Sequence, residues 1–476
     1  IYSCFIKASS FRDKLVSLNK KINWKPKSTG EGRFEKWLEN VNDWNLSRSR
    51  FWGIPLPIWR TEDGKEEICI GSIEELIHEI AKSVEKGFMR ENIFSEFKLN
   101  DMSDENYSKI DLHKNVVDSI ILVSNSGKKM KREEDLIDVW FDSGSMPYAQ
   151  WHYPFENKEN IDSNKFFPAD FIAEGVDQTR GWFYTLHAIS TMVFDSVSYK
   201  NVISNGLVLD KNGQKMSKRL GNAIDPFKTI SDYGPDATRW YMISNSNPWD
   251  NLKFDINGVD EVKRKFFGTL YNTYSFFALY ANIDNFNYKE NEIKFEEKPE
   301  LDRWIISELN TLISKVEKFY EDYEPTKAAR EISDFVIDNL SNWYVRLSRR
   351  RFWKGEYELD KISAYQTLFT VLANICKISA PISPFFMDKM FQDLTRNIDG
   401  KFSESVHLES FPVSDTSKID KDLQEKINYA QIISSLTLSL RAKEKIKVRQ
   451  PLNRILIPVE SLSKKNIINS VSEEIK

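Results

Sequence analysis

Beyond about residue 260, apolar residues recur at helical spacing almost without interruption, and no other feature constrains the fold of this chain as strongly. Each stripe of this kind is typical of the buried face of an amphipathic helix, so successive stripes predict a helical bundle. The first stripe comprises Leu301, Trp304, Ile305, Leu309, Leu312, Ile313, Val316, Phe319 and Tyr320, and the second comprises Ile332, Phe335, Val336, Leu340, Trp343, Tyr344 and Leu347. The third, ended by Pro381 and Pro384, comprises Ile362, Tyr365, Leu368, Phe369, Leu372, Ile375 and Cys376; the fourth comprises Leu423, Ile427, Ala430, Ile433, Leu436 and Leu440.

The 476 residues are too many for one hydrophobic core, so a further domain is expected before the bundle. There the pattern changes to strand, turn and helix. Residues 169–173 are predicted to form a strand that stops at Glu174 and Gly175, and Thr179 is predicted to cap the next helix. The apolar face of that helix comprises Trp182, Phe183, Leu186, Ile189, Met192 and Val193. This order predicts an α/β fold with a parallel sheet that ends near Asp260.

Polar residues gather where this predicted strand meets its helix. Ligands of parallel α/β sheets bind beyond the carboxyl ends of the strands and against helix N-termini, which is where Glu174, Gly175, Asp177 and Gln178 stand. Acidic side chains in this place suit the hydroxyl groups of a ribose. The alternative for Asp177 is a charge that stabilises the helix dipole without touching a ligand.

A basic loop, Lys215-Met216-Ser217-Lys218-Arg219, follows an apolar strand and the turn at Asn212-Gly213. An ammonium group is a compact charge on a flexible stem, so Lys215 and Lys218 are suited to follow charge that builds up on phosphate oxygens. A basic pentapeptide alone is more often a solvated surface loop. The surrounding residues must therefore decide between the two interpretations.

Two more segments of the α/β part are rich in aromatic residues. Residues 136–145 are predicted to form a strand that ends in a polar turn at the wall of a pocket, and Trp140 lies in it. Residues 43–57 are dense in Trp, Arg and Pro; Arg48 and Arg50 together would suit a phosphate backbone, whereas the alternative is a rigid packed loop. For Trp140 and Trp182 the alternative is core packing. Residues 27–32, with two glycines, predict a linker or turn.

Between about residues 60 and 135 the sequence becomes rich in Glu and Lys, which predicts a surface insertion. A helical period runs through its first part, and Val116, Ile120 and Leu122 alternate as in a strand. The polar turns at residues 62–65 and 124–127 have a shape that often carries a zinc knuckle. Neither turn contains a cysteine, so no metal is expected there.

Basic and aromatic residues alternate at the end of the second predicted bundle helix. Arg346, Arg349, Arg350 and Trp353 are the candidates for contact with single-stranded nucleic acid, with Arg351, Phe352 and Lys354 beside them. The alternative is a set of cations favoured by the helix C-terminus. A second basic run, at residues 443–449, precedes Pro451 and marks a linker.

The composition narrows the class of protein. Hydrophobic residues make up 41% and charged residues 29%, and no apolar run reaches the roughly 20 residues of a membrane span. The three cysteines are scattered, which fits a reducing compartment and predicts a cytoplasmic location. A net charge of -4 does not suggest a surface that binds nucleic acid throughout, so any polyanion must bind at local basic patches.

With these residues in place, the sequence resembles the class I aminoacyl-tRNA synthetases, and the isoleucyl-tRNA synthetases most closely. Four stretches carry the resemblance in the same order: residues 43–57, 138–144, 174–183 and 215–222. The helical part that begins at Leu301 resembles the anticodon-binding domain of that family. The Trp-Phe-Asp-Ser-Gly run at residues 140–144 is similar to the isoleucyl rather than the valyl enzymes.

The resemblance implies a fold and a set of site residues. The fold is the second half of a Rossmann-type parallel-sheet nucleotide-binding domain, residues 1–260 with the insertion at about 60–135, followed by an all-α anticodon-binding bundle at 261–442 and a basic junction at 443–476. Trp140 and Trp182 would be walls of the amino-acid pocket. The other implied contacts are Glu174, Gly175, Asp177 and Gln178 with the adenylate ribose and aminoacyl group, Gly206 and Leu207 with adenine, and Lys215, Met216, Ser217 and Lys218 with the triphosphate, where Lys215 and Lys218 are catalytic.

The implied activity is the ATP-dependent attachment of isoleucine to tRNA(Ile), with Mg²⁺ held mostly by the ATP phosphates. The resemblance implies a protein that is a monomer at full length, and neither bound zinc nor a membrane partner is expected. The first residue is Ile1, and neither the His-Ile-Gly-His signature of the family nor its editing insertion occurs in the chain. We therefore expect the chain to be a C-terminal portion that is inactive alone. The alternatives are a valyl enzyme and a tRNA-binding fragment without catalysis.

Overall fold

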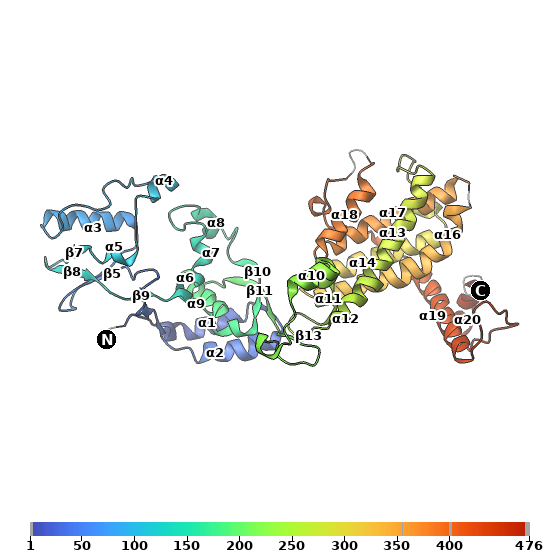
Figure 1. Ribbon diagram of the computed structural model, residues 1–476, viewed down its shortest axis with the longest axis horizontal. Helices are drawn as coiled ribbons and strands as arrows, with labels where there is room; N and C mark the ends of the chain where they lie inside the picture. Colours follow the sequence, from blue (N-terminus) through green and yellow to red (C-terminus); the bar gives the residue numbers. More distant parts are fainter. Residues whose placement is uncertain (1–2, 355, 399–401, 472–476) are drawn as a thin grey trace. The chain divides into compact units, whose positions relative to one another are not determined.

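The computed structural model describes residues 3–354, 356–398 and 402–471, and of Lys218 and Ser463 only the backbone (Figure 1). The chain forms two compact units, Ile1–Asn205 and Gly206–Lys476. Each has its own hydrophobic core, and the two are described separately below.

A parallel three-stranded sheet lies at the centre of the first unit. Its strands are β10 (Ala169–Gly175), β11 (Tyr199–Asn205) and β2 (Asn23–Lys25), in the order β10-β11-β2. Helix α9 (Trp182–Phe194) connects β10 to β11, and it packs against α1 (Arg12–Asn19). The predicted α/β class with a parallel sheet is therefore confirmed, although β10 runs through Glu174 and Gly175 instead of stopping before them.

The glycines near residue 30 lie in a helix and not in a linker or a turn, so that prediction is wrong. Residues Thr29–Phe34 form the π-helix η2, which leads into α2 (Glu35–Glu39). A Cβ atom on Gly30 would lie 2.3 Å from the Trp24 side chain, so glycine is needed here for close packing. Phe34 is fully buried against Trp24, with ring centroids 5.0 Å apart.

The segment predicted as one strand at residues 136–145 is mostly a helix. Strand β9 covers only Leu136–Ile137 and pairs with β4 (Ser47–Arg48), and α6 (Val139–Gly144) follows. Short apolar runs fit a strand or a buried helix equally well, and the cap at Asp138 decides for the helix. The other short elements of this unit are β1 (Phe5–Ile6), η1 (Ala8–Phe11), β3 (Trp44–Asn45), α7 (Met146–Ala149) and α8 (Lys158–Asp162).

Residues 58–132 contain an antiparallel sheet with a core of its own. The order is β6-β5-β8-β7, formed by β5 (Ile58–Thr61), β6 (Glu67–Cys69), β7 (Ile121–Val123) and β8 (Lys129–Arg132). Helix α3 (Ile73–Glu85) packs against β7, and α4 (Asp104–Tyr107) and α5 (Lys114–Val117) are short. Val116 lies in α5 and not in a strand, which corrects the alternation predicted for it.

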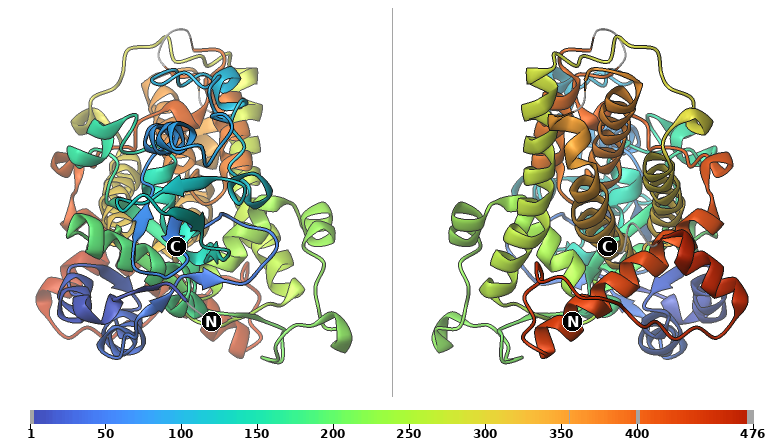
Figure 2. Two further views of the ribbon diagram at one scale, coloured as in Figure 1. Left: turned by 90° about the vertical axis from the view of Figure 1, so that its left-hand side faces the viewer. Right: turned by 90° about the vertical axis from the view of Figure 1, so that its right-hand side faces the viewer.

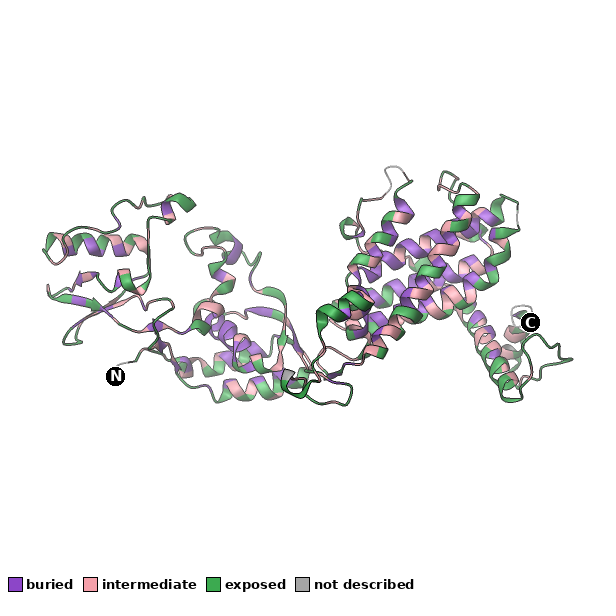
Figure 3. Ribbon diagram, in the orientation of Figure 1, coloured by how far each residue is buried: buried purple, intermediate pink, exposed green. Residues whose placement is uncertain are grey.

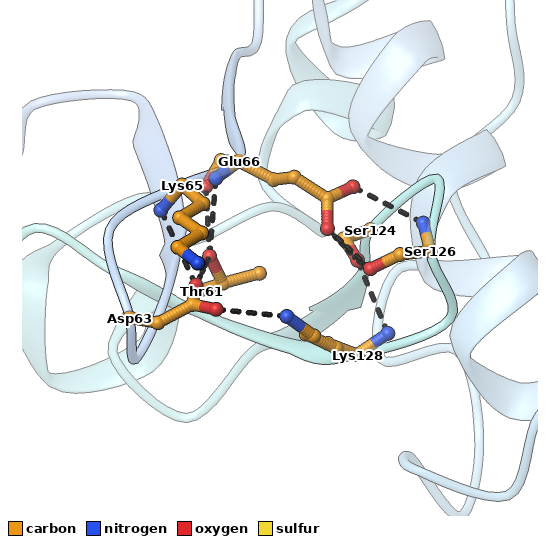
Figure 4. A network of polar contacts seen from close by, with 7 residues as sticks. All are labelled: Thr61, Asp63, Lys65, Glu66, Ser124, Ser126 and Lys128. Atoms are coloured by element: carbon orange, nitrogen blue, oxygen red, sulfur yellow. Dashed lines mark hydrogen bonds and ion pairs between the residues drawn. The ribbon is translucent and has the colours of Figure 1, made fainter.

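The two polar turns of this sheet contact each other directly (Figure 4). Lys128 forms an ion pair with Asp63 at 2.8 Å, and the Ser124 hydroxyl donates a hydrogen bond to Glu66 at 3.2 Å. The Ser126 amide also donates to Glu66, at 3.1 Å. Side-chain hydrogen bonds, first from Lys128 and then from Thr61, lower the pKa of Asp63 well below its usual range. Charged and hydroxyl side chains therefore join the two turns.

The second unit begins with a parallel strand pair and continues as helices. Strand β12 (Val208–Leu209) pairs with β13 (Leu252–Lys253), and between them lie η4 (Lys218–Leu220), α10 (Pro226–Tyr233) and α11 (Pro235–Asn245). The bundle comprises α12 (Ile256–Val262), η5 (Lys263–Phe267), α13 (Gly268–Ile283), α14 (Glu300–Glu321), α15 (Pro325–Asp334), η7 (Phe335–Val345), α16 (Arg346–Trp353), α17 (Leu359–Ser379) and α18 (Pro384–Thr395). Three short 3₁₀ turns are η6 (Phe295–Glu297), η8 (Val406–Leu408) and η9 (Thr416–Lys418).

The predicted helical bundle is confirmed, and its helices lie side by side around one core (Figure 2). Helix α17 lies at the centre of the bundle, and residues on nearly all faces of this helix are buried (Figure 3). The first and third predicted stripes face this core. In the second stripe Leu347 is 41% exposed, because the π-helical η7 widens the turn and shifts the apolar face.

The fourth stripe faces the core only in its first half. Helix α19 (Lys421–Lys443) buries Leu423 and Ile427, whereas Leu436 and Leu440 are more than half exposed. The other helix at this end is the shorter α20 (Leu462–Ser470), which contacts α19. None of the helices in the described part of the chain is both long and apolar enough to cross a membrane.

Candidate active site

In the first unit, the predicted ligand residues lie at the carboxyl end of β10. Glu174 pairs in register with Ser204 of β11, and Gly175 pairs with Asn205. The Glu174 side chain is exposed. Both parallel strands end here, as ligand sites of such sheets require.

A compact turn follows the strand end and holds Asp177 and Gln178. Asp177 lies in the 3₁₀ helix η3 (Val176–Arg180), and its carboxylate accepts a hydrogen bond of 2.9 Å from the Gln178 amide. The side-chain amide oxygen of Gln178 accepts from the Trp182 backbone N–H at 3.0 Å. A Cβ atom on Gly175 would lie 2.6 Å from Asp177 Oδ1, so the carboxylate lies against the backbone of the strand end.

Thr179 does not cap the helix, which corrects the prediction made for it. Its side chain is fully buried, donates to the Val176 carbonyl at 2.8 Å and accepts from Arg33 at 2.9 Å. The backbone N–H of Trp182 at the start of α9 is satisfied by Gln178 instead. A glutamine four residues before a helix start is not a usual cap signal, which is why the sequence pattern pointed to threonine.

The tertiary structure brings Trp140 and Trp182 to the same place. The Trp182 indole donates to the Ser143 carbonyl of α6 at 2.9 Å. A Cβ atom on Gly181 would lie 3.2 Å from the ring of Trp140 and 2.6 Å from the Gln178 amide oxygen. Trp140 is 41% exposed, so core packing does not account for it. The two tryptophans, Gln178 and Gly181 thus form one surface.

Asp138 anchors the helix that carries Trp140. Its carboxylate is buried, accepts from the Trp140 backbone N–H at 3.3 Å and from the Trp44 indole at 3.0 Å, and pairs with Arg48 at 2.8 Å. Arg48 therefore positions the neighbouring motif and is not available to a phosphate backbone as predicted, whereas Arg50 is exposed. The sequence signal for this contact was the Asp in front of a short apolar run, an N-cap pattern.

In the second unit, Gly206 and Leu207 lie directly before β12. The Gly206 N–H donates to the Pro248 carbonyl at 2.9 Å, and a Cβ atom would lie 2.4 Å from the Asp250 carbonyl oxygen. Only glycine allows this approach of two backbones. The Leu207 N–H donates to Asn251 at 2.9 Å, and the Leu207 side chain is half exposed.

The basic loop follows a tight turn, as predicted. Gly213 has φ +83° and its N–H donates to the Asp210 carbonyl at 2.9 Å, and Leu209 bridges Lys215 in antiparallel fashion. Lys215 is exposed, and its ammonium has no hydrogen bond or ion pair with any described residue. The side chain of Lys218, the second predicted catalytic lysine, lies outside the described residues.

Met216 and Ser217 attach this loop to the rest of the unit. Met216 is partly buried and packs against the core of the bundle. The Ser217 N–H donates to Asn222 at 2.9 Å, and its hydroxyl accepts from the Leu220 N–H at 3.2 Å. The loop is therefore held at Met216 and Ser217 while the neighbouring Lys215 side chain extends outwards.

Asp210 and Asn222, to which the sequence assigned no role, join the two ends of the loop. The Asn222 amide donates to the Asp210 carboxylate at 3.0 Å and to the Lys215 carbonyl at 3.3 Å. Asp210 also accepts from the backbone N–H groups of Asn212 and Gln214. These hydrogen bonds, that from Asn222 first, lower the pKa of Asp210. A cavity of about 580 Å³ lies beside the two residues, lined also by Lys211, Asp225, Lys228 and Phe254.

On the bundle, helix α16 sorts its basic residues onto two faces. Arg346, Arg349, Arg350 and Trp353 are exposed. Arg351 points inwards and forms a two-pronged ion pair with Asp302, at 2.6 and 2.8 Å, and Phe352 is buried. Only the first four therefore remain as candidates for contact with a polyanion.

Comparison with known proteins supports the geometry. The family described as tRNA synthetases class I (I, L, M and V) matches residues 2–255, and the anticodon-binding domain of tRNA ligase matches residues 302–457. The chain belongs to the class I tRNA synthetases. The resemblance found in the four sequence stretches is thus confirmed.

Among curated relatives of this synthetase chain, the isoleucine–tRNA ligase of Bacteroides thetaiotaomicron is 64% identical over 471 residues, 98% of this chain and 40% of the relative. That of Porphyromonas gingivalis is 62% identical over 469 residues, 98% of this chain and 41% of the relative. The chain therefore spans about two fifths of the length of the curated relatives it matches.

Two solved synthetases share the fold. Mycobacterium tuberculosis methionyl-tRNA synthetase bound by methionyl-adenylate has a TM-score of 0.56 at 14% identity, covering 86% of this chain and 68% of that one. The ternary complex of LeuRS, tRNA and LeuAMS from Agrobacterium radiobacter K84 has a TM-score of 0.53 at 18% identity, covering 80% and 43%.

Proposed function

We propose that this chain belongs to a protein that attaches isoleucine to tRNA(Ile) with ATP, through an isoleucyl-adenylate intermediate. The observation that carries the proposal is the 64% identity to an isoleucine–tRNA ligase across 98% of the chain. The chain supplies the second half of the nucleotide-binding domain and the anticodon-binding domain. Its proposed divisions are 1–260, with the insertion at about 60–135, then 261–442 and 443–476.

The first step of this reaction needs no general base. The isoleucine carboxylate is ionised at neutral pH, so one of its oxygens attacks the α-phosphorus of ATP directly, and pyrophosphate leaves with the electrons of the broken P–O bond. In the second step a ribose hydroxyl at the end of the tRNA attacks the carbonyl carbon, and AMP leaves. Catalysis of the first step rests on position and on neutralising charge.

The charge would be neutralised by Lys215, Lys218 and the Mg²⁺ that enters with ATP. Lys215 is suited to this role because its ammonium is exposed and has no ionic partner among the described residues. Met216 and Ser217 would hold the loop in place while the lysines follow the phosphates. A lysine paired with a carboxylate would first have to break that ion pair, which would reduce the stabilisation that the lysine gives to the transition state.

The remaining contacts follow from the two strand ends. We assign Glu174, Gly175, Asp177 and Gln178 to the ribose and the aminoacyl group, and Gly206 and Leu207 to the adenine. Asp177 and Gln178 support this assignment because each holds the other in one orientation. Trp140 and Trp182 would form walls of the isoleucine pocket. The closeness of the Trp140 ring to Gly181, the residue before Trp182, supports this assignment.

The partners in this proposal are isoleucine, Mg²⁺-bound ATP and tRNA(Ile), and the full-length protein is a monomer in the cytoplasm. An apolar pocket gains only ~1–3 kcal/mol of discrimination from one methylene, so valine would be rejected incompletely, and isoleucyl enzymes are a known case of this limit. The 476-residue chain by itself, without a His-Ile-Gly-His segment, would not form the adenylate.

The test is amino-acid-dependent exchange of pyrophosphate into ATP by the full-length protein. Isoleucine should support exchange at a kcat/KM of roughly 100 times that of valine. Faster exchange with valine would replace the proposal with a valyl enzyme. No exchange with any amino acid, together with retained tRNA binding, would leave a tRNA-binding protein without catalysis.

A further inference from the structure

A lysine without an ionic partner lies buried in the helical bundle. Lys298, just before α14, is only 8% exposed. Its ammonium reaches one acceptor, the Thr367 hydroxyl, at 3.4 Å. That distance is long for an N–H···O hydrogen bond, and an ammonium has three N–H groups to satisfy.

The other buried cations of the described chain are paired. Arg132 contacts Asp118 at 2.5 Å and Lys361 contacts Asp284 at 2.7 Å. Lys298 has no carboxylate within ion-pair distance among the described residues. A buried charge without a partner is costly, so an unpaired lysine at this position needs a reason.

The buried carboxylate of Asp302 attracts Lys298 but cannot pair with it, because it is already saturated. Asp302 is fully buried and accepts hydrogen bonds from Arg351, from the Tyr344 hydroxyl at 2.9 Å and from the Ser363 hydroxyl at 2.6 Å. Its charge is neutralised by Arg351. Burial consequently lowers the pKa of Lys298 in spite of the attraction of Asp302 and Glu292.

Lys298 and Thr367 line a cavity of about 490 Å³. Its lining includes the apolar side chains of Phe295, Ile306, Leu309 and Ile313. Charged side chains of both signs also line it: Glu292, Lys294, Glu296, Asp415 and Lys418, of which Lys418 and Asp415 form an ion pair at 3.1 Å. Cavities of this size hold small organic ligands. Among these described residues, the cavity therefore combines apolar side chains with one buried ammonium, that of Lys298, which has no carboxylate partner.

We propose that this bundle cavity binds a small organic oxyanion, whose negative oxygen pairs with the Lys298 ammonium and whose apolar part contacts the walls. An oxyanion offers the acceptors that the ammonium lacks, and a charge-assisted hydrogen bond in a buried place is strong. A phosphate monoester and a carboxylate share this chemistry. The proposal is independent of the aminoacylation function, since it uses none of the residues assigned to that site.

The test is calorimetric titration of the 476-residue chain at neutral pH with phenyl phosphate, benzoate, inorganic phosphate and phenol. Phenyl phosphate or benzoate should bind at one site, and phenol, which is neutral, should bind at least about tenfold more weakly. The stronger of the two anions identifies the class of oxyanion. Equal binding by inorganic phosphate would contradict a role for the apolar walls.

Two charge-removing variants separate this site from other basic surfaces. Lys298→Met should weaken the binding of the organic anion by about tenfold or more. Lys315→Met, which removes an exposed lysine paired with Glu331 at 3.0 Å, should leave the binding affinity unchanged. Undiminished binding by Lys298→Met, or no saturable binding of either organic anion by the unaltered chain, would overturn the proposal.

The thermal stability of the ligand-free chain distinguishes a binding lysine from a structural one. Lys298→Met should have a melting temperature equal to or above that of the unaltered chain, because it removes an unpaired buried charge. The difference in melting temperature between Lys298→Met and the unaltered chain should shrink as the pH rises towards the ordinary lysine pKa of about 10.4, since Lys298 then loses its proton. A lowered melting temperature in Lys298→Met would mean that Lys298 is structural.

Discussion

The side-chain amide of Asn222 donates a hydrogen bond to the carboxylate of Asp210 at 3.0 Å, across the base of the basic loop. The carbonyl oxygen of the same amide accepts from the Ser217 N–H at 2.9 Å. One asparagine thus connects the turn before the loop to the middle of the loop. Neither residue has a proposed catalytic role, but together they fix the position of the backbone at Lys215.

Replacing this asparagine should slow adenylation. In Asn222→Ala the loop loses hydrogen bonds worth about 0.5–1.5 kcal/mol each, so the rate of pyrophosphate exchange by the full-length protein should fall by roughly tenfold. The KM for isoleucine should stay the same, because the substitution removes no side chain assigned to the amino-acid pocket. Steady-state kinetics with isoleucine and ATP varied separately measures both quantities.

The matched control for this variant is Lys211→Ala. Lys211 is exposed in the same turn, and none of the hydrogen bonds described above involves its side chain. Its exchange rate should equal that of the unaltered protein. A rate for Asn222→Ala as high as that of Lys211→Ala would show that the loop does not depend on this hydrogen bond.

Gly181 is expected to tolerate no side chain. In Gly181→Ala the new methyl group would lie 2.6 Å from Gln178 and 3.2 Å from Trp140, so both must move. We expect kcat/KM for isoleucine in the exchange reaction to fall by about tenfold or more, which corresponds to ~1.4 kcal/mol. Gly32→Ala is the control, because no heavy atom beyond its chain neighbours and the backbone of its own helix lies within 4 Å of the added methyl group. Equal activity of the two variants would remove Gly181 from the site.

The arginines of α16 should divide between tRNA binding and stability. Arg349→Gln and Arg350→Gln remove exposed cations, so each should weaken tRNA binding and reduce the slope of log affinity against log salt by about one. Filter binding over a range of salt concentrations measures the slope. An unchanged slope in both variants would mean that these cations only stabilise the helix end.

Arg351→Met is the contrasting variant on the same helix. It leaves Asp302 as a buried carboxylate without its ion pair, so the free energy of unfolding should fall by about 3–5 kcal/mol. Denaturant titration of the 476-residue chain measures this loss, which Arg349→Gln should not share. Equal stability of the two variants would contradict the inward position of Arg351.

His187 should make the first unit sensitive to acid. Burial lowers its pKa to about 4, although a hydrogen bond between its ring and the Leu15 carbonyl at 2.9 Å opposes the shift. The ring is neutral, so Nε2 carries the donated proton, and the buried Nδ1 has no described partner. The unfolded chain binds a proton near pH 6.5 and the folded chain only near pH 4, so stability should be lost as the pH falls through this interval.

The expected loss at His187 is on the order of 3 kcal/mol between pH 6.5 and 4, from a shift of about 2.5 pKa units at 1.36 kcal/mol each. Many carboxylates titrate in the same range, so the quantity to compare is the difference between the unaltered chain and His187→Gln. That difference should depend on pH. A difference that stays constant from pH 6.5 to 4 would contradict a buried neutral His187.

Local periodicity was enough to predict the α/β part and the helical bundle. The stripes at 301–320 and 362–376 face the core as expected, because the spacing of apolar residues within one helix decides which face can be buried. The same argument placed Glu174 to Gln178 at the end of a parallel strand. Recurring motifs in a fixed order were enough for the family.

Contacts between distant segments decided the rest. Asp138 caps a helix with a carboxylate that Arg48 and Trp44 hold in place. Gly30 lies in a helix at a position where Trp24 leaves no room for a side chain. Leu436 and Leu440 are exposed because α19 extends beyond the helices that bury its first half. Arg351 pairs inwards while Arg349 and Arg350 face solvent.

The amino-acid sequence by itself determined the elements that depend on neighbours along the chain: the helical stripes, the tight turn before Lys215 and the strand ends that carry polar residues. Only the tertiary structure decided which polar groups are satisfied and which are free. It joined Asn222 to Asp210, and it left Lys298 buried without a carboxylate. The physical reason is that periodicity reports which face of an element is buried, whereas hydrogen bonds and ion pairs form between residues that only folding brings together.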